Sequence, residues 1–198
     1  MTSVKPVNLF HRMKHDTAVK DCGVKNYHVH FRKKFTCRNK DNIKIRISVD
    51  DYYKLYINGK FVCQGPASAY YTSYKYNEID ISEYIRDGNN IISVHFFYSG
   101  LINSVSNSGD GRFGLAAQIF SGDKILLETD SSWLCSESAE FSGETVGYDT
   151  AFLENIDFRK SEKGWTEYVF DDSKYENAVI LKSDDHIDDV NNLQSIIL

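Results

Sequence analysis

Adjacent pairs of aspartates are the groups in this sequence with the clearest capacity for acid–base chemistry. Hydrolytic sites built on two carboxyl groups hold them about 5–10 Å apart. Neighbouring residues of a β-strand point to opposite faces, so Asp50 and Asp51 meet one substrate only if a turn brings them together. The later pairs lie in polar loop or tail sequence, and we expect solvated carboxylates rather than a catalytic pair. The pairs are Asp50 and Asp51, Asp171 and Asp172, Asp184 and Asp185, and Asp188 and Asp189.

A long polar segment, 101–113 (LINSVSNSGDGRF), is the best candidate for a metal site. Loops of this length either carry function or are disordered. Asn103, Asn107 and Asp110 offer oxygen ligands in a glycine-containing context, which Ca²⁺ accepts. Their spacing does not match an EF-hand loop. We therefore expect no cofactor, with calcium at these three residues as the alternative.

Two histidines, His28 and His30, are spaced to share one face of a strand. Zinc sites need further His or Cys ligands, and none lies nearby in the sequence. We expect these histidines, and the basic cluster at Arg32, Lys33 and Lys34 that follows, to lie on the solvated side of a strand. The sequence also contains neither a GxSxG nucleophile elbow nor a phosphate-binding loop.

A run of tyrosines offers a contact surface. Aromatic rings can hold the apolar face of a sugar while amides bind its hydroxyls, in a concave pocket with a few placed polar groups. The same rings could instead pack beneath a loop or against another domain, because aromatic residues are enriched at such contacts. Both interpretations stay open. The candidates for sugar or domain contact are Asn58, Gln64, Ser68, Tyr70, Tyr71, Tyr74 and Tyr76.

The elements that position these groups are predicted to be short strands. In 50–65, Tyr53, Leu55 and Ile57 alternate with more polar neighbours, and Asn58 with Gly59 predicts a type I′ turn that closes a hairpin. Helix is expected only as single turns, at 81–85 and 171–175. Such a pattern is typical of an all-β, antiparallel β-sandwich. The other predicted strands are 27–37, 43–49, 78–81, 91–97, 115–120, 124–128, 131–135, 145–152 and 178–181.

Composition narrows the class of protein. The chain has 198 residues, 41% hydrophobic and 14% aromatic, and a net charge of −5 that argues against nucleic acid and anionic membrane as partners. It contains no apolar run long enough to span a membrane and no apolar signal-peptide centre at its start, so we expect a cytoplasmic protein. The four cysteines are widely spaced and predict free thiols. Trp133 and Trp165 are expected to be core or capping residues.

The order of these signals resembles the amino-terminal β-sandwich module of bacterial α-L-rhamnosidases, glycoside hydrolase family 78. The resemblance covers about residues 27–181. It is carried by 53–65, YKLYINGKFVCQG, followed by 68–76, 79–85, 88–94, FGLAAQIFSGDKILLETDSSWLCS at 113–136, 148–165 and FDDSKY at 170–175.

The resemblance implies a galactose-binding-domain-like jelly roll at 27–181, with an irregular lead-in at 1–26 and a linker at 182–198. It implies a non-catalytic accessory domain whose partner is the carboxyl-terminal catalytic α/α-barrel of the same protein. Rhamnose-containing glycans are a second partner that the resemblance allows. The alternatives are an autonomous carbohydrate-binding module, or a structural interaction domain unrelated to hydrolases.

Overall fold

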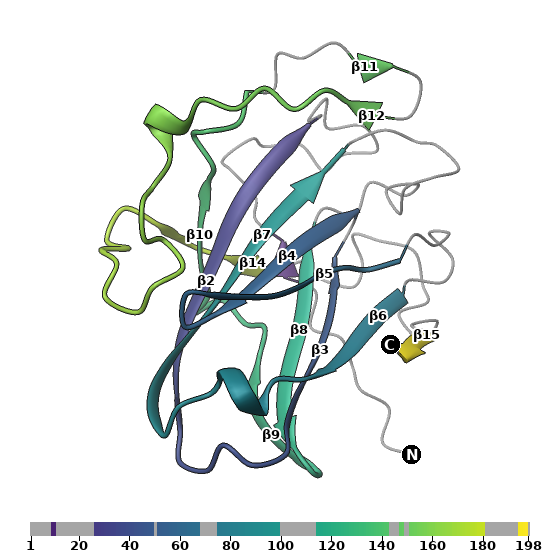
Figure 1. Cartoon of the computed structure of the whole chain (residues 1–198), viewed down its shortest axis with the longest axis vertical. Helices are drawn as coiled ribbons and strands as arrows, with labels where there is room; N and C mark the ends of the chain where they lie inside the picture. The colour runs from purple at the N-terminus through teal and green to yellow at the C-terminus, as the bar shows by residue number, and fades with distance from the viewer. Residues whose placement is uncertain are drawn as a thin grey trace.

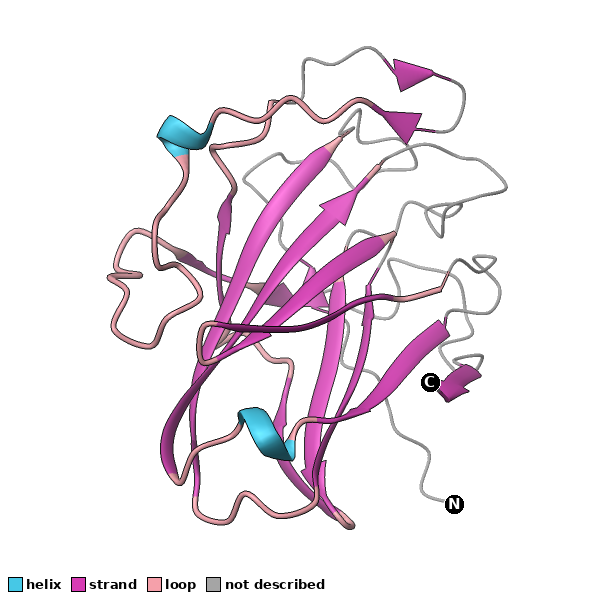
Figure 2. Ribbon diagram, viewed as in Figure 1, coloured by secondary structure: helices cyan, strands magenta, loops and turns pink. Residues whose placement is uncertain are grey.

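The computed structural model describes residues 9–10, 26–49, 51–67, 75–99, 114–142, 147–148, 151–180 and 194–197. Within these ranges the chain forms two main sheets, antiparallel except for one strand pair, which pack face to face (Figure 1). The only helix among the described residues is two 3₁₀ turns, η1 (Ser82–Tyr84) and η2 (Phe158–Lys160), which stand out in Figure 2. The expected β-sandwich with little helix is confirmed.

The first sheet carries the candidate site. Its strand order is β13-β10-β2-β7-β4-β5, and β2 pairs with β7 along its whole length. β7 is buried on both faces over most of its residues, as its near-continuous apolar sequence predicts. The strands are β2 (Tyr27–Cys37), β4 (Tyr52–Ile57), β5 (Lys60–Gly65), β7 (Gly88–Tyr98), β10 (Leu134–Glu137) and β13 (Glu176–Asn177).

The second sheet closes the core from behind. Its order is β14-β1-β8-β3-β6-β15, with β9 paired to β8, and the β15–β6 contact is the parallel one. Two of its short strands, β1 and β15, lie outside the predicted sandwich range of 27–181. The strands are β1 (Leu9–Phe10), β3 (Ile43–Val49), β6 (Lys75–Asp80), β8 (Leu115–Ser121), β9 (Lys124–Glu128), β14 (Val179–Ile180) and β15 (Gln194–Ile197). A separate ribbon pairs β11 (Gly147–Tyr148) with β12 (Ala151–Phe152).

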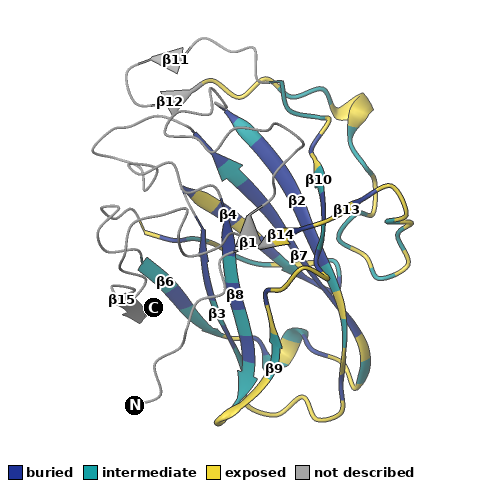
Figure 3. Cartoon of the chain, turned by 180° about the vertical axis from the view of Figure 1, so that it is seen from behind, coloured by how far each residue is buried: buried dark blue, intermediate teal, exposed yellow. Residues whose placement is uncertain are grey.

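The core consists of the inward-facing residues of both sheets. On β4, Tyr53, Leu55 and Ile57 are buried while their neighbours are exposed or half-buried, which is the alternation that the sequence predicts. The fully buried Trp133 closes one side of this core, as expected. From behind, buried residues run along β2, β7, β3 and β8, and the exposed ones gather in the connecting segments (Figure 3).

The β4–β5 hairpin has the predicted two-residue turn. Asn58 and Gly59 have φ values of 51° and 81°, and Ile57 pairs with Lys60 across the turn. Buried Asn58 also ties the hairpin to β7: its amide oxygen accepts from the Ile91 N–H at 3.1 Å. Its amide nitrogen donates to Tyr84 O and to Asn90 Oδ1, at 2.9 and 2.8 Å.

Three of the expectations about surface residues are wrong. His28 and His30 share one face of β2, but both are buried, and so is Arg32. The reason is that a covering segment far away in sequence, residues 138–142 and 151–175, packs over these three side chains on the outer face of the sheet. Asp51 is also buried, where its carboxylate accepts from the Ser99 N–H at 2.6 Å rather than facing solvent.

Cys37, Cys63 and Cys135 are free thiols, as expected. No helix in the described part of the chain is long and apolar enough to cross a membrane.

Candidate functional site

The outer face of the first sheet carries a cluster of three histidines. His28 and His30 lie on β2, and His95 is the β7 residue paired with His30. His28 Nδ1 is 3.0 Å from His95 Nε2, and the His30 ring meets His95 edge-on with centroids 5.5 Å apart. All three side chains are buried.

Aromatic residues of the covering segment lie flat on two of these imidazoles. Phe141 stacks on His28 and Trp165 stacks on His30, each with ring centroids 3.8 Å apart. Trp165 therefore caps the outer face, in keeping with its expected role. Close packing of this kind excludes water from the imidazoles.

Burial keeps the His28 and His95 rings neutral at pH 7. Burial, reinforced by the neighbouring His30, lowers the pKa of His28 to about 4 and that of His95 to about 2. The Lys54 ammonium on β4 lowers both values further. Glu162 faces the cluster from the covering segment, 3.5 Å from His30 Nδ1, and accepts a hydrogen bond from Tyr175 Oη at 2.6 Å.

A buried ion pair fixes the covering segment farther along β2. The Arg32 guanidinium, which is fully buried, donates to the Asp172 carboxylate at 3.2 Å and to Glu167 O at 3.1 Å. It also lies over the Phe170 ring, 4.8 Å from its centroid. Lys34 reaches the same carboxylate at 3.1 Å. The basic cluster thus serves largely to hold the segment against the sheet.

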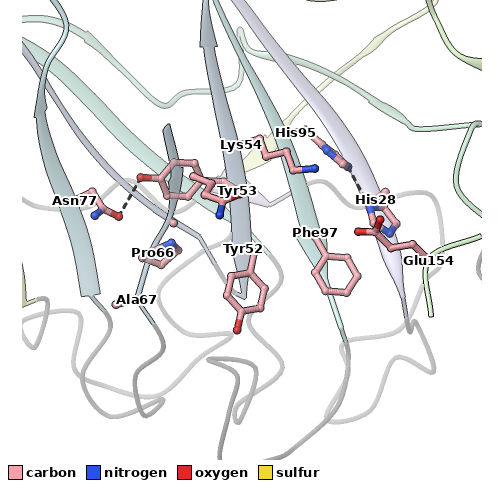
Figure 4. Close-up of a pocket in the computed structure, with 12 residues that line it drawn as sticks. His28, Tyr52, Tyr53, Lys54, Pro66, Ala67, Asn77, His95, Phe97 and Glu154 are labelled. Carbon is pink, nitrogen blue, oxygen red and sulfur yellow. Dashed lines mark hydrogen bonds between the residues drawn. The ribbon is translucent and has the colours of Figure 1, made fainter. Parts of the chain in front are cut away.

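A pocket of about 470 Å³ opens beside the histidines, at the end of the sheet where β4 begins. Volumes of about 300–1,000 Å³ are usual for small-molecule sites. Tyr52 and Phe97 lie side by side on one wall (Figure 4), with centroids 6.4 Å apart and planes within 14°. The lining residues are His28, Tyr52, Tyr53, Lys54, Gln64, Gly65, Pro66, Ala67, Asn77, His95, Phe97 and Glu154.

The deep wall of the pocket is rigid. The buried Tyr53 donates from Oη to Asn77 Oδ1 at 3.0 Å, which joins the two sheets at this point (Figure 4). Burial raises the pKa of the Tyr53 hydroxyl well above its usual range, so the hydroxyl stays a donor. Gly65 packs so closely here that a Cβ would lie 2.5 Å from Asn77 Oδ1.

Comparison with known families identifies the fold. The family described as "Alpha-L-rhamnosidase N-terminal domain" matches residues 40–196. The chain belongs to this family. A search of curated proteins finds no match.

Solved structures agree with membership of the rhamnosidase N-terminal family. A family 78 rhamnosidase of Bacillus sp. GL1 superposes with a TM-score of 0.79 at 23% identity, over 91% of this chain and 19% of that one. The α-L-rhamnosidase of Aspergillus terreus superposes with a TM-score of 0.73 at 22% sequence identity. The match covers 96% of this chain and 22% of that enzyme. The chain thus spans about a fifth of the length of these enzymes. A Pleurotus ostreatus lectin superposes with a TM-score of 0.51 at 17% sequence identity. The match covers 89% of this chain and 41% of the lectin.

The contact residues expected from the sequence are only partly brought together. Gln64 lines the pocket, whereas Asn58 and the half-buried Tyr76 do not. The amide of Asn58 is already engaged in hydrogen bonds within the fold. Ser68, Tyr70, Tyr71 and Tyr74 lie outside the described residues, although Ala67, just before them, lines the pocket.

The calcium candidates Asn103, Asn107 and Asp110 likewise lie outside the described residues. Among the residues that are described, no group of three or more His, Cys, Asp or Glu side chains has the arrangement of a metal site.

Sequence reasoning missed several pocket residues: Tyr52, Lys54, His95, Phe97 and Glu154. The pairing of Tyr52 with Phe97 depends on the register between β4 and β7, which a single sequence does not reveal. The shared face of Tyr52 and Lys54 was readable from the alternation in 52–57. Glu154 follows β12 and reaches the pocket from the covering segment, for which no local signal exists.

Proposed function

We propose that this chain is the non-catalytic, amino-terminal accessory domain of a larger α-L-rhamnosidase-like glycoside hydrolase, in which it packs on a catalytic α/α-barrel. The main support is that residues 40–196 match the rhamnosidase N-terminal family. The chain also corresponds to only about a fifth of the length of the rhamnosidases with a similar fold.

The environment of the carboxylates supports a non-catalytic role. Glycoside hydrolysis uses two carboxyl groups about 5–10 Å apart. Among the described residues, the pocket contains one carboxylate, Glu154. Other carboxylates are held in structural pairs: Asp172 with Arg32, Glu162 with Tyr175, and Asp157 with Arg159 at 2.8 Å.

Exposed apolar side chains on the covering segment support a docking role. Leu153, Phe158 and Val169 are 69%, 73% and 89% exposed. Burial of apolar area stabilises an interface by about 25 cal/mol per Å², so side chains of this size are suitable anchors. We assign the contact with the catalytic barrel to this segment.

Separate production of this chain and the remainder of its parent enzyme tests the docking role. Calorimetric titration of the two parts should detect association, and Phe158→Ser with Val169→Ser should weaken it about 10-fold or more. Ile125→Ser is the matched control, because Ile125 is an exposed apolar residue on β9 of the other sheet. Equal weakening by the control, or no association at all, contradicts the proposal.

Glycan recognition is the finer part of the proposal, with an autonomous carbohydrate-binding module as its alternative. The lectin of similar fold and the aromatic pair in the pocket support it. The test compares the parent enzyme with and without this domain on a rhamnose-containing polysaccharide and on a small aryl rhamnoside. A higher KM on the polysaccharide alone supports recognition, whereas equal changes on both substrates contradict it.

A further inference from the structure

Three polar side chains in the pocket have no partner within the described part of the protein. Lys54, Gln64 and Glu154 are exposed, and none of them makes a hydrogen bond or ion pair with another described residue. This differs from the rest of the outer face, where Arg32 and Glu162 are both engaged. The pocket therefore offers a donor, an amide and an acceptor that the fold itself does not use.

A buried nitrogen lies in the same wall. His28 is 4% exposed, and its Nδ1 is occupied by the contact with His95. Its other nitrogen, Nε2, is buried with no hydrogen-bond partner. Buried polar atoms without partners are uncommon in native proteins, so this nitrogen is a further hydrogen-bonding group that the fold leaves unused.

The aromatic wall has the shape that a sugar ring needs. Tyr52 and Phe97 turn their faces the same way and lie next to each other (Figure 4), so they form one flat surface across β4 and β7. The negative face of an aromatic ring attracts the weakly positive C–H groups of a pyranose. Tyr52 is 41% exposed, which leaves this surface accessible.

The charges in the pocket select a neutral ligand. Lys54 and Glu154 carry opposite charges and the imidazoles of His28 and His95 are uncharged at neutral pH, so the pocket has no net charge. An anionic ligand such as a uronic acid would gain from Lys54 but meet the carboxylate of Glu154. A polyhydroxylated neutral ring can hydrogen bond to both.

We propose that this pocket binds a neutral pyranose, with the ring on Tyr52 and Phe97 and its hydroxyls on Lys54, Gln64 and Glu154. The inference rests on the glycan-recognition part of the proposed function. It can fail while the docking role stands, because docking is assigned to Leu153, Phe158 and Val169 and is measured without sugar.

Chemical-shift titration of the ¹⁵N-labelled chain provides the test. The probes are methyl α-L-rhamnoside and methyl β-D-galactoside as neutral rings, and methyl β-D-glucuronide as the charged one. At least one neutral probe should shift the amide signals of β4, β7 and Gln64 with a Kd of about 1 mM, or −4 kcal/mol. Stronger binding of the glucuronide, or no shift with any probe at about 50 mM, overturns the proposal.

Two variants with matched controls locate the site. Tyr52→Ala and Glu154→Gln should each raise the Kd about 5-fold or more, because they remove ring surface and an acceptor. Phe61→Ala and Glu176→Gln change an exposed aromatic and an exposed carboxylate outside the pocket and should leave the Kd unchanged. Binding that survives Tyr52→Ala undiminished, in a variant with a native spectrum, places the sugar elsewhere and overturns the assignment.

Discussion

His28 Nδ1 and His95 Nε2 lie 3.0 Å apart across two neighbouring strands, beneath the ring of Phe141. When both imidazoles are neutral, one nitrogen donates and the other accepts, so a single proton lies between the two atoms. A second proton would leave two donors facing each other in a site without water. Protonation of both rings would therefore break the contact, and burial disfavours a charge on either ring.

Stability should consequently fall when the pH drops below the unfolded pKa of histidine. Folded pKa values of about 4 for His28 and about 2 for His95 lie below the unfolded value of 6.5, so the unfolded chain binds more protons in this range. The free energy of unfolding should decrease from pH 6.5 toward pH 4, by up to about 1.4 kcal/mol per pH unit for each proton. Urea denaturation at pH 7.5, 6.0 and 5.0 measures it.

The charged groups around His28 and His95 determine the pH range over which this experiment reports on the two histidines. Glu162 faces the cluster, and its hydrogen bonds with His30 and Tyr175 lower the pKa of its carboxyl group. The change between pH 6.5 and 5 therefore reports the histidines. His28→Asn should flatten the slope, and a stability independent of pH over this range would count against the neutral pair.

Loss of the Asp172 charge should be costly. Asp172→Asn leaves the fully buried Arg32 guanidinium without its counter-ion, and removal of one partner of a buried pair costs about 3–5 kcal/mol. Asp171→Asn is the control, because Asp171 is exposed and its remaining oxygen still accepts from the Ser173 N–H. Chemical denaturation should show a change below about 0.5 kcal/mol for the control. Equal effects of the two substitutions would show that Arg32 does not depend on Asp172.

Gly65 should not tolerate a side chain. In Gly65→Ala, the new Cβ would lie 2.5 Å from Asn77 Oδ1 and 3.1 Å from Tyr53 Oη, two buried groups that hydrogen bond to each other. Overpacking of this kind costs about 1–3 kcal/mol. Thermal unfolding should show a lower Tm for Gly65→Ala and little change for Gln64→Ala, an exposed neighbour on the same strand. An unchanged Tm in Gly65→Ala would mean that this wall is less rigid than described.

The strands were largely predictable from sequence because their period is local. The alternation in 43–49 predicts β3 to the residue, and Asn58 with Gly59 predicts the turn between β4 and β5. The two-residue strands β1 and β13 carry no such signal, since a period cannot be read from two residues.

The site was much less predictable because its burial comes from distant sequence. His30 and Arg32 have the polarity of a solvated strand face, yet Trp165 and Asp172 cover them from more than a hundred residues away. Asn58 has the chemistry of a ligand contact, but its amide is engaged by Tyr84 O and by two residues of β7.

Hydrolysis of 4-nitrophenyl α-L-rhamnopyranoside tests the accessory-domain account most directly. The purified 198-residue chain and its parent enzyme are assayed side by side at equal concentration. We expect nitrophenol release by the parent and none above the enzyme-free rate by the isolated chain. Turnover by the isolated chain would contradict the account if it disappears in Glu154→Gln, because Glu154 is the carboxylate that lines the described pocket.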